Sequence, residues 1–237
     1  MSLGTLTWLG HATFVLETPG GKRVMFDPWV TGNPATPEGQ ADPGDLDVIL
    51  VSHGHSDHTG DLVRLAKEKG PKAVVAMIEL TDWLDGEGVE NTVGMNKGGT
   101  AEVEGLRVTM THAVHSSSIG REDGSIMYLG DPAGLVVTLE NGYKVYFAGD
   151  TDVFSDMALI GELHQPDMAM LPIGDHFTMG PAAAAKAVEL LGVRRVLGMH
   201  YGTFGLLTGT PAALREACSA RGLDVTVEEL KPGESLR

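Results

Sequence analysis

The chain of 237 residues is poor in cysteine, in aromatic residues and in basic residues. Cys218 is its one cysteine, so no disulfide can form within the chain, and a reducing compartment suits it best. Aromatic residues make up 5% of the sequence, which predicts a core built mainly from aliphatic side chains. The N-terminus shows no basic region followed by an apolar stretch, and no run is long enough to span a bilayer. We therefore expect a cytoplasmic protein without stable membrane insertion.

Lysine and arginine number 17 against 32 aspartate and glutamate residues, which gives a formal net charge of −15. Phosphate backbones bind basic surfaces, so this charge argues against a nucleic-acid partner. The simplest interpretation is a solvated acidic surface. The charge still allows a small-molecule substrate, including an anionic one, because bound metal ions can reverse the potential locally. A homo-oligomer is as compatible with the sequence as a monomer.

Short apolar strands and helices alternate along the chain, in an order that occurs twice. The first half predicts strands at 5–17, 22–26, 47–52, 73–77 and 106–111, and helices at 61–69 and 80–84. The second half predicts strands at 134–140, 143–148, 167–172, 196–199 and 225–230, and helices at 181–191 and from Thr210-Pro211 to Gly222. Two such halves packed sheet to sheet form a four-layer αββα sandwich of the α/β class. No low-complexity linker divides the chain, so we expect one domain over residues 1–237.

A histidine-rich loop directly after the buried strand at 47–52 carries the strongest chemical signal. The run His53-Gly-His-Ser-Asp-His58 places four metal-capable side chains on one tight loop: His53, His55, Asp57 and His58. Imidazole and carboxylate groups suit Zn²⁺, Mn²⁺ and Fe. The loop lets His53 and His55 converge on one ion while Asp57 and His58 face a second. This pattern favours a metal site over a purely structural loop.

The run resembles the HxHxDH signature of the metallo-β-lactamase superfamily. That family has three later ligands at strand ends, and the chain offers His115, Asp150 and His200 in the expected order. The resemblance covers nearly the whole chain. The segments 8–13 and 26–29 are similar to the branch with ascorbate-phosphate lactonase and the phospholipase D that acts on N-acyl phosphatidylethanolamines. The resemblance implies one metal held by His53, His55 and His115, a second held by Asp57, His58 and His200, and Asp150 bridging both.

The resemblance also implies a dinuclear metal-dependent hydrolase with two divalent ions, zinc first and manganese or iron as alternatives. A metal-bridging hydroxide would attack an ester, lactone, amide or phosphoester, since two ions about 3.5–4 Å apart lower the pKa of bound water towards about 7. Two other functions stay open. One is a mononuclear iron oxygenase acting on thiols or persulfides, and the other is a metal-stabilised protein that binds a metabolite without turnover.

Several residues beside the ligand set are further candidates. His112 competes with His115 as the third ligand of the first metal, and the family pattern favours the histidine immediately before the serines. His11 and Asp27 could hydrogen-bond to ligands and orient them, with a core histidine and a turn carboxylate as the simpler interpretations. His176 lies in the second-half loop that corresponds to the histidine-rich loop, and we expect it to face substrate or relay protons. The predicted catalytic residues are thus Asp57, His176 and His11.

Overall fold

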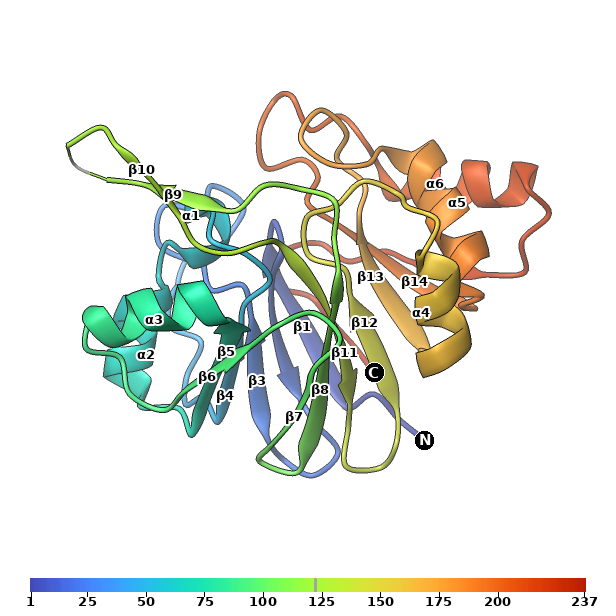
Figure 1. The fold of residues 1–237 in the computed structure, drawn as a ribbon. Coiled ribbons are helices and arrows are strands. Elements are labelled where there is room, and N and C mark those ends of the chain that lie inside the picture. The colour runs from blue at the N-terminus through green and yellow to red at the C-terminus, as the bar shows by residue number, and fades with distance from the viewer. Residues whose placement is uncertain (122) are drawn as a thin grey trace.

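Two seven-stranded mixed sheets form the centre of the computed structural model, which describes residues 1–121 and 123–237 (Figure 1). The first sheet contains β1 (Thr5–Gly10), β2 (Thr13–Glu17), β3 (Arg23–Phe26), β4 (Val48–Leu50), β5 (Ala73–Met77), β6 (Thr92–Met95) and β16 (Ser235–Leu236). The second contains β7 (Thr100–Val103), β8 (Leu106–His112), β11 (Ala133–Thr138), β12 (Lys144–Phe147), β13 (Met168–Pro172), β14 (Arg195–Met199) and β15 (Thr226–Glu228). A separate hairpin pairs β9 (Ser118–Gly120) with β10 (Ile126–Tyr128).

The two sheets show the same succession of strand pairings. From β16 through β1, β2 and β3 the pairings are antiparallel, and from β3 through β4 and β5 to β6 they are parallel. The second sheet repeats this succession in the order β7, β8, β11, β12, β13, β14, β15. This repetition agrees with the two similar halves predicted from the sequence.

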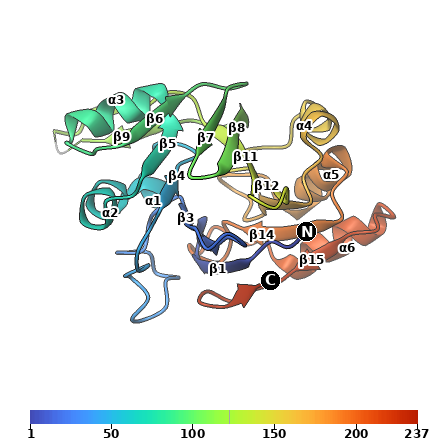
Figure 2. The same cartoon turned by 90° about the horizontal axis from the view of Figure 1, so that it is seen from below.

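Helices cover the outer face of each sheet, as the two views in Figures 1 and 2 show. The first half carries α1 (Ser56–Thr59), α2 (Leu62–Lys69) and α3 (Ile78–Gly86), and the second carries α4 (Met157–His164), α5 (Pro181–Leu191) and α6 (Pro211–Ala220). The ends of the helices follow local signals. Thr210 caps α6 by accepting a hydrogen bond from the Ala213 N–H, and α2 ends at Gly70 with a left-handed φ of 56°. In the described part of the chain, no helix is long and apolar enough to cross a membrane.

The core has two parts, which follow the alternation of side chains along the strands. In β11, Leu135 and Val137 belong to the core shared by the two sheets, whereas Val136 packs with the helices of the second half. In β12, Phe147 lies in the inner part and Tyr146 in the outer part. Strands buried on both faces explain the continuous apolar runs in the sequence. The order of layers is helix, sheet, sheet, helix, which confirms the predicted αββα sandwich.

Residues 5–17 do not form one strand, so that prediction was wrong. The chain turns at His11 and Ala12, and β1 pairs antiparallel with β2. Gly10 has a φ of 103° and His11 a φ of 55°, the left-handed backbone that a tight turn requires. Both strands are buried over most of their length, so no group of polar residues marked the turn in the sequence.

Several elements escaped prediction from the sequence: strands β6, β7, β9, β10 and β16, the one-turn helix α1 inside the histidine-rich loop, and helix α4. The strands are two to four residues long and only partly buried, so they show no clear hydrophobic period. In α4, Met157 and Ile160 are the buried residues, which is too few to make an amphipathic pattern evident.

Candidate metal centre

Loops from both sheets meet at one edge of the sandwich and bring the predicted ligands together. The histidine-rich loop follows β4, Asp150 follows β12 and His200 follows β14. His115 comes from the segment after β8, and His11 from the turn between β1 and β2. The carboxyl ends of parallel strands share one edge of a sheet, so their loops form a common site. Residues far apart in the sequence therefore become neighbours.

The first group of predicted ligands is the three-histidine cluster of His53, His55 and His115, in which one nitrogen of each ring lies within 4.8 Å of the other two. Nε2 of His53 is 3.0 Å from Nδ1 of His55. Burial, followed by the nearby charge of His58, lowers the pKa of His53 well below its ordinary value. Burial also lowers the pKa values of His55 and His115. The three rings are therefore neutral, the form of imidazole that binds a metal ion.

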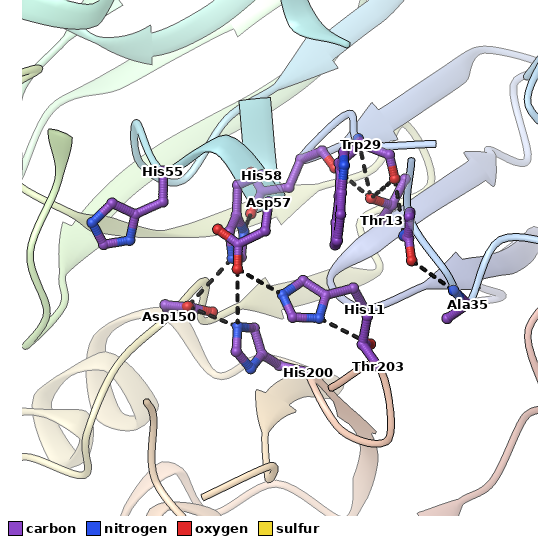
Figure 3. Close-up of polar contacts among 12 residues, drawn as sticks. His11, Thr13, Trp29, Ala35, His55, Asp57, His58, Asp150, His200 and Thr203 are labelled. Carbon is purple, nitrogen blue, oxygen red and sulfur yellow. Dashed lines mark hydrogen bonds and ion pairs between the residues drawn. The ribbon is translucent and has the colours of Figure 1, made fainter. Parts of the chain in front are cut away.

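The second group is the aspartate cluster of Asp57, His58 and His200, which His11 joins (Figure 3). Oδ2 of Asp57 is 3.1 Å from Nε2 of His11 and 4.0 Å from Nε2 of His200. Burial by itself would raise the pKa of Asp57. The hydrogen bond to His11 and the charge of His58 outweigh burial and lower this pKa below its ordinary value, so the carboxylate is ionised.

Asp150 lies between the two clusters. Its Oδ2 is 3.0 Å from Nε2 of His200 and 3.3 Å from Nε2 of His58, and on the other side 3.5 Å from His115 and 4.0 Å from His53. Burial would raise the pKa of Asp150, but attraction to His200 and His58 outweighs it and lowers the pKa well below its ordinary value. A single buried carboxylate thus contacts both clusters.

Four buried polar atoms of this centre make no hydrogen bond of acceptable geometry among the described residues, although Nε2 of His200 and of His58 lie 3.0 and 3.3 Å from Oδ2 of Asp150. They are Nε2 of His58, Oδ1 of Asp150 and both ring nitrogens of His200. A buried polar group that lacks a partner costs about 1–3 kcal/mol, so several in one place call for a ligand. Converging nitrogen and oxygen donors are the ligands that Zn²⁺, Mn²⁺ and Fe accept. The residues present therefore fit metal binding.

A buried hydrogen-bond network behind the ligands starts at Asp27. Nδ1 of His58 donates to its Oδ2 over 2.7 Å, and Ser52 donates its backbone N–H to Oδ1 and its hydroxyl to Oδ2 over 2.7 and 2.6 Å. Burial raises the pKa of Asp27, partly offset by His58 and Ser52. The Ser52 hydroxyl oxygen also lies 3.0 Å from Nδ1 of His53. These contacts place the ring protons on Nδ1 and leave Nε2 of His53 and His58 to face Asp150.

His11 is fully buried beside the aspartate cluster. Burial lowers its pKa to about 4, so the ring is neutral near pH 7. Nε2 then donates to Asp57, and Nδ1 accepts from the Thr203 hydroxyl over 3.0 Å (Figure 3). The His11 carbonyl accepts the backbone N–H of His200. His11, Asp27 and His200 have φ values of 55°, 43° and 57°, a left-handed conformation that costs non-glycine residues about 1–3 kcal/mol and clusters at functional sites.

A cavity of about 840 Å³ opens over both clusters. Part of its lining consists of the predicted ligands His55, Asp57, His115, Asp150 and His200. Another part is apolar and comes from Trp29, Phe177, Phe204 and Leu206. Predominantly apolar walls with a few converging polar groups are typical of small-molecule sites.

Two predicted candidates lie outside the clusters. His112 has an exposed side chain, and its ring packs against Phe154 at a centroid distance of 5.1 Å. The structure thus brings His115, and not His112, beside His53. His176 is exposed in the loop after β13, with its ring 4.4 Å from the ring of Phe177, and its role in the reaction stays a prediction.

Sequence reasoning missed several residues that the fold brings to the centre. Ser52 links Asp27 to His53, and its position at the end of the buried strand was the available signal. Thr203 holds His11, although 192 positions separate the two residues. Phe177 and Phe204 line the cavity, and bulky aromatic residues in glycine-rich loops were the signal that could have found them.

Comparison with known proteins agrees with this geometry. The model of the beta-lactamase superfamily domain matches residues 22–201. A UPF0173 metal-dependent hydrolase from Rubrobacter xylanophilus is 52% identical over 231 residues, which cover 98% of this chain and 95% of that protein. One from Archaeoglobus fulgidus is 49% identical over 230 residues and covers 97% of both chains. A solved metallo hydrolase from Ignicoccus hospitalis superposes with a TM-score of 0.85 at 33% identity, covering 98% of this chain and 97% of that one. The chain therefore belongs to the beta-lactamase superfamily domain family, and it is a metal-dependent hydrolase.

Proposed function

We propose that this hydrolase works with two metal ions, one in each cluster, and that it cleaves an ester, lactone, amide or phosphoester. The observation that carries the proposal is the position of Asp150, whose Oδ2 lies between 3.0 and 4.0 Å from histidines of both clusters. A buried carboxylate in this position is suited to bind one ion in each cluster. A single ion on the three histidines would leave Asp57, His58 and His200 without a function.

Two divalent ions, when bound, lower the pKa of bound water towards about 7 and stabilise negative charge that develops on oxygen. The protein's own contribution is to fix charges and protons around them. Asp57 and Asp150 supply two negative charges, while Asp27 and Ser52 hold the ring protons of His58 and His53 on Nδ1. Two carboxylates against four positive charges leave the centre cationic, which favours the oxyanion of a hydrolytic transition state.

His11 has the position of a residue that orients Asp57. Because the pKa of His11 is about 4, its ring is neutral near pH 7. A neutral imidazole can donate a hydrogen bond but does not act as a general acid. Its Nε2–H binds Oδ2 of Asp57, and Thr203 fixes the tautomer from the other side. We keep His176 as a substrate-facing residue because it adjoins Phe177, which lines the cavity.

The other functions considered from the sequence have less support. A mononuclear iron oxygenase would need the three-histidine cluster only, whereas a second cluster with four donors is present. A protein that binds a metabolite without turnover does not require both clusters and a shared carboxylate. The cavity of about 840 Å³ has the size of a small-molecule site, which supports a small substrate.

Elemental analysis of the purified protein tests the proposal. We expect about two equivalents of zinc or manganese per chain, with two clusters to hold them. Hydrolysis on a panel of esters, lactones and phosphodiesters should stop with a chelator and return with metal. One equivalent of iron without hydrolysis would contradict the two-metal proposal. Two tightly bound ions without turnover on the panel would favour the binding function instead.

A further inference from the structure

We propose that the substrate is a neutral ester, lactone or amide whose hydrocarbon or aromatic group binds to Trp29, Phe177, Phe204 and Leu206. This inference rests on the proposed function, because it names the substrate class of the same site. The sequence left an anionic substrate open, and the lining of the cavity argues for an uncharged one.

Three large apolar side chains are exposed where they line the cavity. Phe177 is 51% exposed, Phe204 37% and Leu206 55%. Scattered exposed hydrophobic residues are ordinary, but a group that converges on one cavity is typical of a binding site. Burial of these side chains by a ligand removes their apolar surface from water and so favours apolar ligands.

The loops that carry these side chains are tied to one another and to the metal centre. The backbone N–H of Gly209 donates to the Gly174 carbonyl over 3.2 Å, which joins the loops after β14 and β13. The Leu207 N–H donates to the Phe204 carbonyl over 3.0 Å and closes a turn around the exposed side chains. Thr203 in the same loop binds His11. The backbone of these two loops is therefore held in place before a ligand arrives, which reduces the entropic cost of binding.

The apolar surface extends directly to the metal centre. The ring of Phe204 lies 6.0 Å from that of Trp29 and 5.5 Å from that of His11. Trp29 is in turn 5.3 Å from His11. A substrate with its scissile bond at the two clusters therefore has its apolar substituent beside these rings.

Among the described residues, the lining of the cavity offers an anionic substituent no lysine or arginine. Within the part of the chain that the structure describes, the charged residues of the lining are Asp57 and Asp150. Carboxylates and phosphates are normally bound through arginine or lysine. A negative charge away from the scissile bond would therefore have no partner.

The test is a series of p-nitrophenyl esters, from acetate to octanoate, assayed with the metal-loaded protein. A buried methylene changes the free energy by about 0.8 kcal/mol, so kcat/KM should rise up to about fourfold per added methylene until the cavity is filled. The p-nitrophenyl monoester of adipic acid is the matched anionic substrate, because it has the length of the hexanoate ester with a terminal carboxylate. We expect its kcat/KM to be at least about tenfold lower than that of the hexanoate ester.

Variants locate the effect in the protein. Phe177→Ala and Phe204→Ala should each lower the ratio of octanoate to acetate kcat/KM by about tenfold, since they remove apolar contacts to the longer chain. Ile126→Ala is the matched control, because its side chain on β10 is 77% exposed but does not line the cavity. It should leave that ratio unchanged.

The outcomes separate this inference from the proposed function. Hydrolysis that ignores chain length, or that prefers the adipate ester, would overturn the apolar substrate class and leave the two-metal hydrolase intact. If no ester is cleaved, calorimetric titration with hexanol and octanol tests whether the cavity binds apolar ligands. Affinity that rises with chain length and falls in Phe204→Ala supports the apolar site, and absence of binding overturns it.

Discussion

Replacing Asp27 by asparagine removes a buried carboxyl group behind the predicted metal ligands and preserves the size of the side chain. The carboxylate of Asp27 accepts three hydrogen bonds: from Nδ1 of His58, and from the backbone and the hydroxyl of Ser52. An asparagine side chain has one oxygen that can accept hydrogen bonds. Its NH₂ group would replace the other carboxylate oxygen and would face an N–H or O–H group from which it cannot accept. At least one buried donor therefore loses its acceptor in Asp27→Asn.

The expected magnitude follows from two known costs. A buried donor without an acceptor destabilises the fold by about 1–3 kcal/mol. Loss of the carboxylate that orients a ligand histidine typically weakens metal binding by about 10–100-fold, or about 1.4–2.8 kcal/mol. The larger loss should occur in the aspartate cluster, because His58 contacts Asp27 directly while His53 does so only through Ser52.

Zinc titration against a competing chelator measures the affinity of both clusters, and urea denaturation of the metal-free protein measures stability. Asp61→Asn is the matched control. Asp61 is 2% exposed and accepts hydrogen bonds from the backbone N–H groups of Val30 and Thr31 over 2.6 and 2.7 Å and from Arg64 over 2.7 Å, and none of these bonds involves a predicted ligand. This variant should lose stability and keep the zinc affinity of the wild type. A folded Asp27→Asn protein with unchanged affinity at both clusters, or an equal loss in Asp61→Asn, would refute the reasoning.

Three further variants test the site and the loops around it. Asp57→Ala should lower kcat by about 100- to 1,000-fold with an unchanged circular dichroism spectrum, because a metal ion held in place stabilises the transition state by several kcal/mol; full activity would sink the assignment. His115→Ala should lose about one equivalent of metal while His112→Ala keeps both, and elemental analysis showing the reverse would exchange their assignments. Gly174→Ala should lower the free energy of unfolding by about 1–3 kcal/mol or more, since a Cβ there would overlap the carbonyl oxygen of His200; an unchanged urea midpoint would argue against this close approach.

The histidine-rich loop could be found in the sequence because its donors stand in one local pattern directly after an apolar strand. His115, Asp150 and His200 show no such local pattern, and they became candidates through the resemblance to the metallo-β-lactamase superfamily. Hydrophobic runs, glycine stops and proline starts are local signals too, which is why α5 has the predicted bounds of residues 181–191. The repeated order of these signals also predicted two similar halves.

The β1–β2 turn shows where local patterns fail. Residues on both sides of it are buried, so polarity does not change where the chain reverses. Only pairing between the two strands reveals the turn, and with it the position of His11. The contact between His11 and Thr203 depends on how the second half packs on the first, which no short segment encodes.

By itself the sequence determined most of the longer strands and helices, the αββα class and the metal donors of the histidine-rich loop, because burial and backbone preference are local properties of short segments. Which donors meet was implied by the family resemblance alone, because their contacts belong to the tertiary structure, where Asp150 lies between the clusters and His115 lies beside His53. Only the tertiary structure decided that Phe177 and Phe204 line one cavity. These contacts join segments from different strands and halves. They are fixed by the packing of two sheets, which depends on the whole chain at once.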